Sequence, residues 1–179
     1  SMLFVFPTVR YRVAQAVEDI RQYQQGNVNT SNGLRFHMWE IALSEIKEHP
    51  LIGIGTNGYE ALWEARKKDP SLPRFYSPHN SFLYMMVSYG IAGIVALCWL
   101  LFLLMRSGWR HRDTPLGFAL LVFATVFIIG SITDTQVISF ATAVGLALFT
   151  GVMEAIDGFG KNPDIGEDNN QKTGNNLTG

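Results

Sequence analysis

Cysteine and charge are both scarce in this sequence. Its 179 residues include a single cysteine, Cys98, and only 16% of them are charged, against roughly 25% in soluble domains. One cysteine excludes an internal disulfide and a cysteine-based metal site. The formal net charge of -1 gives no reason to expect nucleic-acid binding. Together with 47% hydrophobic residues, this composition indicates a membrane protein.

Patterns for a metal or a cofactor are missing as well. The four histidines have no paired carboxylates at the spacing that metal ligands require, so we expect no metal and no other cofactor. Gly53, Gly55 and Gly58 do fit the G-x-G-x-x-G pattern of dinucleotide sites. The segment before them is helical rather than a strand, however, and no βαβ unit surrounds it. We interpret these glycines as a structural turn.

What the sequence does contain is long uncharged runs. Residues 80–105 form a run of 26, residues 114–133 a run of 20 and residues 135–153 a run of 19. Because about 20 apolar residues of helix cross a bilayer, we predict an all-α integral membrane protein with three transmembrane helices. Asp134 separates the last two runs, and a carboxylate in mid-bilayer costs about 2.5 to 3.5 kcal/mol. We therefore place it in a tight turn, where we expect it to cap the last helix rather than to serve function.

The more polar residues 1–79 are expected to form a separate helical domain. Apolar residues at helical spacing predict one amphipathic helix through Val13 and Ile20 and a second, ending near Glu48, through Trp39 and Ile46. We expect these two stripes to pack together. A third short helix is predicted from Asn57. Prolines then keep the chain extended up to residue 79.

Both ends of the chain carry their own signals. The short apolar segment of residues 3–6 ends at a proline and is too short to span, so we interpret it as the cut end of a membrane helix. We accordingly expect the chain to be the C-terminal piece of a larger protein. Residues 154–179 are rich in Gly, Asn and Asp with few large apolar residues, and we predict a disordered tail.

Two residues are candidates for chemistry, Arg35 and His79. Arg35 falls in the first turn of the second predicted helix, where an arginine can join the free N–H groups in binding an anion. The alternative for it is a solvated surface arginine. His79 precedes the first apolar run, where a titratable group can meet both a lipid-borne and a water-soluble substrate. The alternative for it is a structural histidine that caps the following helix.

Several short motifs follow one another along the chain. They are Gly33-Leu34-Arg35, Trp39, His49-Pro50-Leu51-Ile52-Gly53-Ile54-Gly55, His79-Asn80-Ser81-Phe82-Leu83 and Gly90-Ile91-Ala92-Gly93. Their order and spacing resemble the O-antigen ligase and polymerase family, which consists of bacterial integral membrane glycosyltransferases. The resemblance covers roughly residues 7–153.

This resemblance implies a multi-pass protein of the bacterial inner membrane with residues 1–79 in the periplasm. Its implied reaction transfers an undecaprenyl-diphosphate-linked glycan to an acceptor such as lipid A-core. Arg35 matches the arginine that holds the lipid diphosphate, and His79 matches the catalytic histidine, either a base toward the acceptor hydroxyl or a diphosphate contact. Arg74 and Asn80 are further candidates for substrate binding. Membrane lipids and the protein's own N-terminal membrane helices are the other implied partners.

A second arginine that the family carries in an earlier periplasmic loop is outside this chain. We therefore expect this piece alone to be inactive. Polymerisation of lipid-linked repeats and glycosylation of proteins remain alternatives within the same fold. From another class, a transporter fragment would carry polar groups in the middle of its spans. The spans here hold only scattered Ser, Thr and Gly, which favours the enzyme.

Charge does not determine the orientation in the membrane. Arg66, Lys67, Lys68 and Arg74 precede the first run, and three arginines of the loop after it, with Lys161, match them in number. The positive-inside count is therefore a tie. The basic segment before the run is expected to be either a solvated face or a contact with lipid phosphates.

Overall fold

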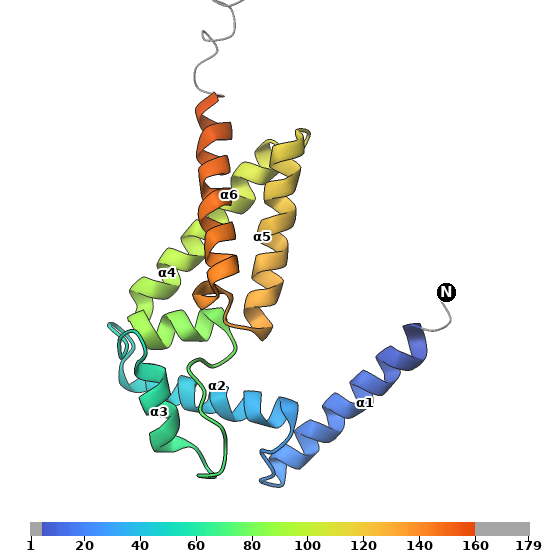
Figure 1. Ribbon diagram of the computed structural model, residues 1–179, viewed down its shortest axis with the longest axis vertical. Helices are drawn as coiled ribbons and strands as arrows, with labels where there is room; N and C mark the ends of the chain where they lie inside the picture. The colour runs from blue at the N-terminus through green and yellow to red at the C-terminus, as the bar shows by residue number, and fades with distance from the viewer. Residues whose placement is uncertain (1–4, 160–179) are drawn as a thin grey trace, which may run out of the picture. The chain divides into compact units, whose positions relative to one another are not determined.

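The computed structural model describes residues 5–159, and these residues form helices and connecting loops without a strand. The helices are α1 (Val5–Gln24), α2 (Ser31–Glu48), α3 (Gly58–Arg66), α4 (Ser81–Arg110), α5 (Pro115–Thr133) and α6 (Phe140–Phe159), with a 3-10 turn, η2 (Gln136–Ile138), before α6 (Figure 1). The all-α prediction is confirmed. Three helices, α4, α5 and α6, are long and apolar enough to cross a membrane.

The chain divides into two compact units. The first comprises the residues up to Leu97 together with Ser131–Thr135, and the second comprises Cys98–Gly130 together with the residues from Gln136 on. The boundary therefore falls within α4 and near the end of α5. The first unit contains α1, α2, α3 and the beginning of α4.

The core of the first unit lies between α2 and α3. The buried residues of α2 recur at helical spacing and are His37, Met38, Ile41, Ala42 and Glu45. Tyr59, Leu62 and Trp63 of α3 pack in the same cluster. Trp39 and Ile46, which the sequence placed on the apolar face of this helix, lie only partly buried at the edge of the cluster. The direction of the core face is thus shifted by about one residue from the predicted stripe.

The predicted apolar face of α1 is exposed. Val13, Val17 and Ile20 have exposed fractions of 57%, 54% and 42%, so the expectation that this stripe packs on the second helix is wrong. Polar side chains join α1 to α2 instead. The Asn32 amide donates to Asp19 at 2.8 Å, and the Tyr23 hydroxyl donates to Glu40 at 2.8 Å.

Backbone hydrogen bonds join the loop after α2, residues 50–55, to a break in α4, and we call this contact the joint. At Gly90 the backbone leaves the helix with φ 63° and ψ -152°, and α4 changes direction there (Figure 1). Ile54 and Gly55 donate their N–H groups to the carbonyls of Val87 and Ser88 at 2.8 and 2.9 Å, and Ile91 donates to Pro50 at 3.0 Å.

The joint requires glycine. A Cβ atom at Gly53 would overlap the Val87 carbonyl, and one at Gly90 would overlap the Leu51 carbonyl. Both residues also have a positive φ, which glycine adopts without penalty. The glycines of the G-x-G-x-x-G pattern thus serve a structural turn, as predicted. The helix after the break, residues 91–110, has a length of about 30 Å at 1.5 Å per residue, which matches the hydrocarbon thickness of a bilayer.

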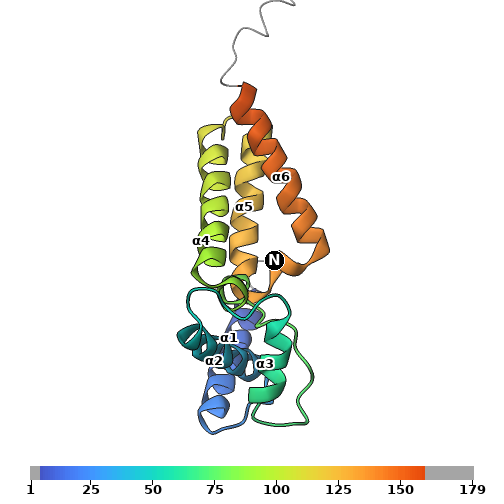
Figure 2. The same ribbon diagram turned by 90° about the vertical axis from the view of Figure 1, so that its left-hand side faces the viewer.

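In the second unit, α5 runs beside the C-terminal half of α4 (Figures 1 and 2). The rings of Phe123 in α5 and Phe149 in α6 stack with centroids 4.1 Å apart. At the other end of these helices, Asp157 accepts a hydrogen bond from Ser107 at 3.2 Å and lies 3.7 Å from Arg110.

The observed helix ends differ from the predicted spans at three places. α4 continues to Arg110, five residues beyond the uncharged run, because arginines can extend from a helix end toward water. α6 begins at Phe140 rather than near residue 135, since η2 occupies the intervening segment. It also continues to Phe159, so residues 154–159 are helical and the predicted tail is wrong there. The rest of the tail and residues 1–4 lie outside the described residues.

Candidate active site

The segment before α4 is held against the rest of the first unit by buried residues and one long-range hydrogen bond. Ser77 and Pro78 are buried, and the Trp39 indole N–H donates to the Pro78 carbonyl at 2.9 Å. The bond spans 39 residues of chain, so α2 fixes the position of the residue that follows Pro78. That residue is His79.

His79 has an unusual backbone conformation. Its φ is 48°, in the left-handed region that non-glycine residues seldom occupy. Such conformations cost of order 1 to 3 kcal/mol and persist where the surroundings enforce them, which is often at functional sites. The imidazole packs edge-on against Phe75 with centroids 5.8 Å apart and stays 38% exposed. The ring is thus both oriented and accessible.

The imidazole of His79 contacts the carboxylate of Asp134. Nδ1 of His79 lies 3.1 Å from Oδ1 of Asp134, and the same oxygen accepts the Thr135 backbone N–H at 2.8 Å. The hydrogen bond from His79 lowers the pKa of Asp134, against the opposing effect of partial burial. The Thr135 N–H and the positive charges of His79 and Arg35 lower this pKa further. Asp134 is therefore a fixed, ionised partner for the histidine.

Three hydrogen bonds hold the two sides of this pair together. The Asn80 backbone N–H donates to the Thr135 hydroxyl at 3.1 Å, and the Asn80 side-chain amide donates to the Ile132 carbonyl at 3.0 Å. The Ser81 hydroxyl donates to the Asp134 carbonyl at 3.2 Å. The carbonyl oxygen of the Asn80 side chain also accepts the Leu83 N–H at 2.9 Å and so caps α4. Both the nitrogen and the oxygen of the Asn80 side-chain amide therefore have hydrogen-bond partners. A role for Asn80 in substrate binding remains a prediction.

Arg35 is the fifth residue of α2 and thus lies just past the first turn, in which it was predicted. Thr30 caps this helix by accepting the Gly33 N–H at 3.0 Å. Arg35 is close enough to Asp134 for its charge to lower the pKa of that carboxyl. No hydrogen bond or ion pair between Arg35 and another side chain occurs among residues 5–159. Its guanidinium is free to bind an anion next to the His79–Asp134 pair.

The other basic residues before α4 are mostly paired. Arg66 bonds Glu45 at 2.8 Å and Glu48 at 3.0 Å. Lys67 and Lys68 pair with Glu64 and Glu40 at 3.0 and 2.9 Å. Arg74 is exposed and has no ion pair within the described part of the chain. Of the four, Arg74 is the residue best placed to meet a phosphate.

Among residues 5–159, one group of side chains is close enough together to be considered as a metal site. Glu45, Glu48 and His49 present ligand atoms within 4.8 Å of one another. Nδ1 of His49 lies 2.6 Å from Glu45, and the guanidinium of Arg66 pairs with both carboxylates. Because a cation already neutralises this group, a metal ion would have to displace Arg66. The backbone N–H of His49 donates to the Glu45 carbonyl at the end of α2, and its ring contacts the Glu45 carboxylate.

Asp134 is the site residue that sequence reasoning missed. It was placed correctly in a turn between two apolar runs, but its interpretation as a helix cap is wrong. α6 begins six residues later, and the carboxylate faces His79 and Thr135. The sequence did offer a signal: Asp134 is a lone carboxylate between two predicted spans. If the spans alternate in direction, it lies on the same side of the membrane as His79, which precedes the first span. A titratable residue at such a position is a functional candidate by itself.

These features define a class: a helical membrane protein in which a histidine just before one apolar helix pairs with a carboxylate just after the next, near an arginine of α2 that has no side-chain partner among residues 5–159. Residues 1–98 match the family model described as O-antigen ligase. This is more than half of the chain, and the chain therefore belongs to the O-antigen ligase family. The family comprises glycosyltransferase-like membrane proteins of ligase and polymerase type.

One relative comes from Haemophilus influenzae (strain ATCC 51907 / DSM 11121 / KW20 / Rd) and is described as an uncharacterized protein. It is 40% identical over 93 residues, which cover 49% of this chain and 23% of the relative. The chain thus matches less than a quarter of the length of this curated relative.

Proposed function

We propose that the protein transfers a glycan from undecaprenyl diphosphate to an acceptor such as lipid A-core. It would act in the bacterial inner membrane, with residues 1–79 and Asp134 on the periplasmic side. The observation that carries this proposal is the contact between His79 and Asp134, near Arg35, which forms no ion pair among the residues that the structure describes. Family membership supports a ligase or polymerase type of reaction in general.

In this proposal His79 is the general base. An ionised Asp134 at Nδ1 favours the tautomer that donates Nδ1–H to the carboxylate and leaves a lone pair on Nε2. Nε2 then removes the proton from the acceptor hydroxyl as that oxygen forms its bond to the anomeric carbon. The charge of Asp134 stabilises the imidazolium that results.

Arg35 supports the leaving group. As the acceptor oxygen attacks, the bond between the anomeric carbon and the diphosphate oxygen breaks, and its electron pair remains on the diphosphate. A guanidinium near a helix N-terminus binds such an anion through charge-assisted hydrogen bonds, and the helix dipole adds to the attraction. The proton on His79 afterwards passes to solvent or to the released diphosphate.

Transfer by the full-length protein tests these roles. His79→Ala should reduce glycan transfer about 10²- to 10⁴-fold, the usual contribution of a general base, while the protein still inserts. Asp134→Asn should also reduce transfer and alter its pH dependence, because the ring loses its ionised partner. His49→Ala is the matched control, since this exposed histidine also contacts a carboxylate. Normal transfer by well-expressed His79→Ala protein would reject the assignment.

The acceptor is tested separately. Lipid A-core, a lipid-linked repeat unit and an acceptor peptide should be offered in parallel to the same donor. We expect product with lipid A-core. Product only with the repeat unit or only with the peptide would make the protein a polymerase or a protein ligase, respectively.

Thiol labelling tests the orientation. In a Cys98→Ala background, cysteine introduced at the exposed Gln25 should react with a membrane-impermeant reagent in intact spheroplasts. Cysteine at the exposed Asp113 should react only after lysis. Asp113 is preferable to Gly108, where a side chain would collide with Leu121. The reverse pattern would place residues 1–79 in the cytoplasm.

A further inference from the structure

A groove of about 720 Å³ lies along one side of α2, within the first unit. Its lining residues on α2 begin with Phe36 and end with Glu48, and they recur three and four positions apart. This face is different from the one that packs on α3. It extends over roughly 18 Å of helix at 1.5 Å per residue, which is long enough for several sugar units.

Aromatic rings form one part of the groove. The rings of Tyr23 and Phe36 lie 5.6 Å apart at 58°, and those of Phe36 and Trp39 lie 6.0 Å apart at 80°. Each of the three residues is only partly buried. Leu43, with an exposed fraction of 49%, continues this apolar surface along α2. The groove therefore offers aromatic and aliphatic surface to a ligand.

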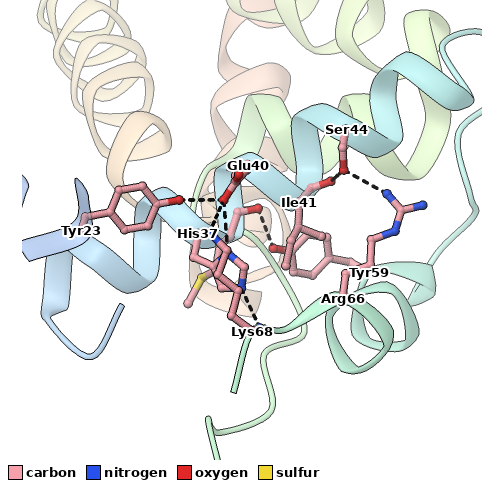
Figure 3. A network of polar contacts seen from close by, with 9 residues as sticks. Tyr23, His37, Glu40, Ile41, Ser44, Tyr59, Arg66 and Lys68 are labelled. Carbon is pink, nitrogen blue, oxygen red and sulfur yellow. Dashed lines mark hydrogen bonds and ion pairs between the residues drawn. The ribbon is translucent and has the colours of Figure 1, made fainter. Parts of the chain in front are cut away.

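Polar side chains form the rest of the lining, and Glu40 is the most firmly held. Figure 3 shows Tyr23, His37 and Lys68 converging on its carboxylate. The Tyr23 hydroxyl donates to Oε2 at 2.8 Å and the Lys68 ammonium at 2.9 Å. These two bonds, that of Lys68 first, lower the pKa of Glu40 to about 2.

The second oxygen of Glu40 is available. All the contacts of this carboxylate with described residues are made by Oε2, which leaves Oε1 as a charged acceptor on the groove wall. Ser44, Lys47 and Glu48 add a hydroxyl, an ammonium group and a second carboxylate along the same face. The lining thus alternates apolar surface with hydrogen-bonding groups.

We propose that this groove binds the saccharide chain of one of the two substrates. A sugar ring has apolar C–H faces that pack on aromatic rings and a rim of hydroxyls that bond to carboxylates, hydroxyls and ammonium groups. An apolar helix in the groove would remove the charged groups of Glu40, Lys47 and Glu48 from water and offer them no hydrogen bond, which is costly. A polar peptide would leave the rings of Phe36 and Trp39 uncovered. The saccharide satisfies both kinds of surface.

Two connections join the groove to the proposed reaction centre. Trp39 lines the groove and also donates its indole N–H to Pro78, next to His79. Phe36 follows Arg35 directly in α2. A glycan in the groove would therefore extend away from the reacting sugar. The identity of the saccharide as donor or acceptor glycan rests on the proposed function, whereas binding itself does not.

Direct binding tests the groove without any transfer reaction. The probes are lipid-free core oligosaccharide and lipid-free O-polysaccharide, both released by mild acid, mixed with the full chain in detergent micelles. We expect saturation-transfer NMR signals from at least one of them. Leu43→Arg, which places a long cation in the groove from a half-exposed position, should abolish this signal or weaken binding about tenfold. Ile52→Arg is the matched control, because Ile52 is apolar, 83% exposed and outside the groove.

The outcomes separate this inference from the proposed function. In the full-length protein, Leu43→Arg should raise KM about tenfold for the substrate that carries the bound glycan and leave kcat within about twofold. His79→Ala should lower kcat instead. Equal binding by wild type and Leu43→Arg, or no binding of either probe by wild type, would overturn the groove assignment. Loss of binding in Leu43→Arg without any transfer by wild type would retain the groove and reject the reaction.

Discussion

The two units differ in where their large apolar side chains lie: the first has a core that buries several of them, and the second exposes many of them. In the first, Trp63 and Tyr59 have no exposed surface, and each donates a hydrogen bond to a carbonyl outside α3. In the second, large apolar side chains such as Trp99, Phe118 and Phe140 are exposed by 61%, 62% and 84%. The first unit thus has the interior of a water-soluble domain, and the second has the outer surface of helices in lipid.

This difference shows which part of the protein holds side chains in fixed positions. The interior of the first unit is defined by polar groups that reach across long sequence distances, and the candidate site uses the same device in the bonds of Trp39 and Asn80. The helices of the second unit need only length and hydropathy to insert. Precise positions for chemistry therefore belong to the first unit.

The largest expected effect comes from a matched pair of tryptophans. Trp63→Ala should destabilise the chain by about 3 to 5 kcal/mol, because it leaves a cavity and an unpaired Pro73 carbonyl. Trp99→Ala should cost less than about 1 kcal/mol, since the side chain faces outward. Thermal unfolding in detergent, followed by helical circular dichroism, measures both. Equal losses would mean that the units do not differ in this way.

The next effect concerns two arginines. Arg35→Ala in the full-length protein should lower transfer about 10²- to 10³-fold, as removal of one anion-stabilising donor does. Arg35→Lys should restore part of it, because the charge returns without the guanidinium geometry. Arg110→Ala, in the second unit and paired with Asp157, is the control and should stay within about twofold. Comparable losses at both positions would point to a general effect of charge.

Substitution of glycines at the joint should have a smaller effect, which we expect in the free energy of unfolding. Gly53→Ala should cost about 2 to 3 kcal/mol, because its Cβ meets the Val87 carbonyl and its φ is positive. Gly55→Ala shares the positive φ but meets no atom within 4 Å, so it should cost about 1 kcal/mol and lower the protein yield only modestly. Gly151→Ala in α6 has open space and a helical backbone and should be neutral or slightly stabilising. A reversed order among the three unfolding temperatures would contradict the joint.

The smallest effect is that of pH on Glu40. Its folded pKa of about 2 is below the ordinary 4.5, so its contribution to stability is complete above pH 4.5 and declines as pH falls toward 2. Because the side chain is 58% exposed, this contribution should be below about 1 kcal/mol. The difference in unfolding temperature between wild type and Glu40→Gln should therefore shrink as the solution is acidified below pH 4.5. Glu18→Gln, which removes an exposed pair with Arg21, should show almost no difference at any pH.

Local sequence signals predicted the helices well. The uncharged runs specified three apolar helices, and α2 ends at Glu48 as the proline after His49 indicated. The same signals failed where burial decides. The stripe of Val13 and Val17 has correct helical spacing, yet it is exposed in this chain. Periodicity defines a face but does not say which partner covers it.

The residues of the candidate site also fall into those that local sequence signals predicted and those that they did not. Arg35 and His79 were found from the resemblance together with a helix start and the edge of an apolar run. Asp134 was assigned to a helix cap, because a turn residue has a local explanation and its contact with His79 spans 55 residues. The left-handed backbone of His79 had no sequence signal either, since the surrounding packing enforces it.

The sequence by itself determined the membrane class, the helices and the residue types available for anion binding and proton transfer. Hydropathy, capping and proline placement act within a few residues and can be recognised from the linear order. Only the tertiary structure decided that Asp134 faces His79, that Arg35 has no side-chain partner within the described part of the chain, and that Trp39 links a groove on α2 to the segment before α4. These relations depend on close packing of backbone and side chains that are distant in the chain, as at Gly53 and Gly90, where the absence of a Cβ lets two segments meet.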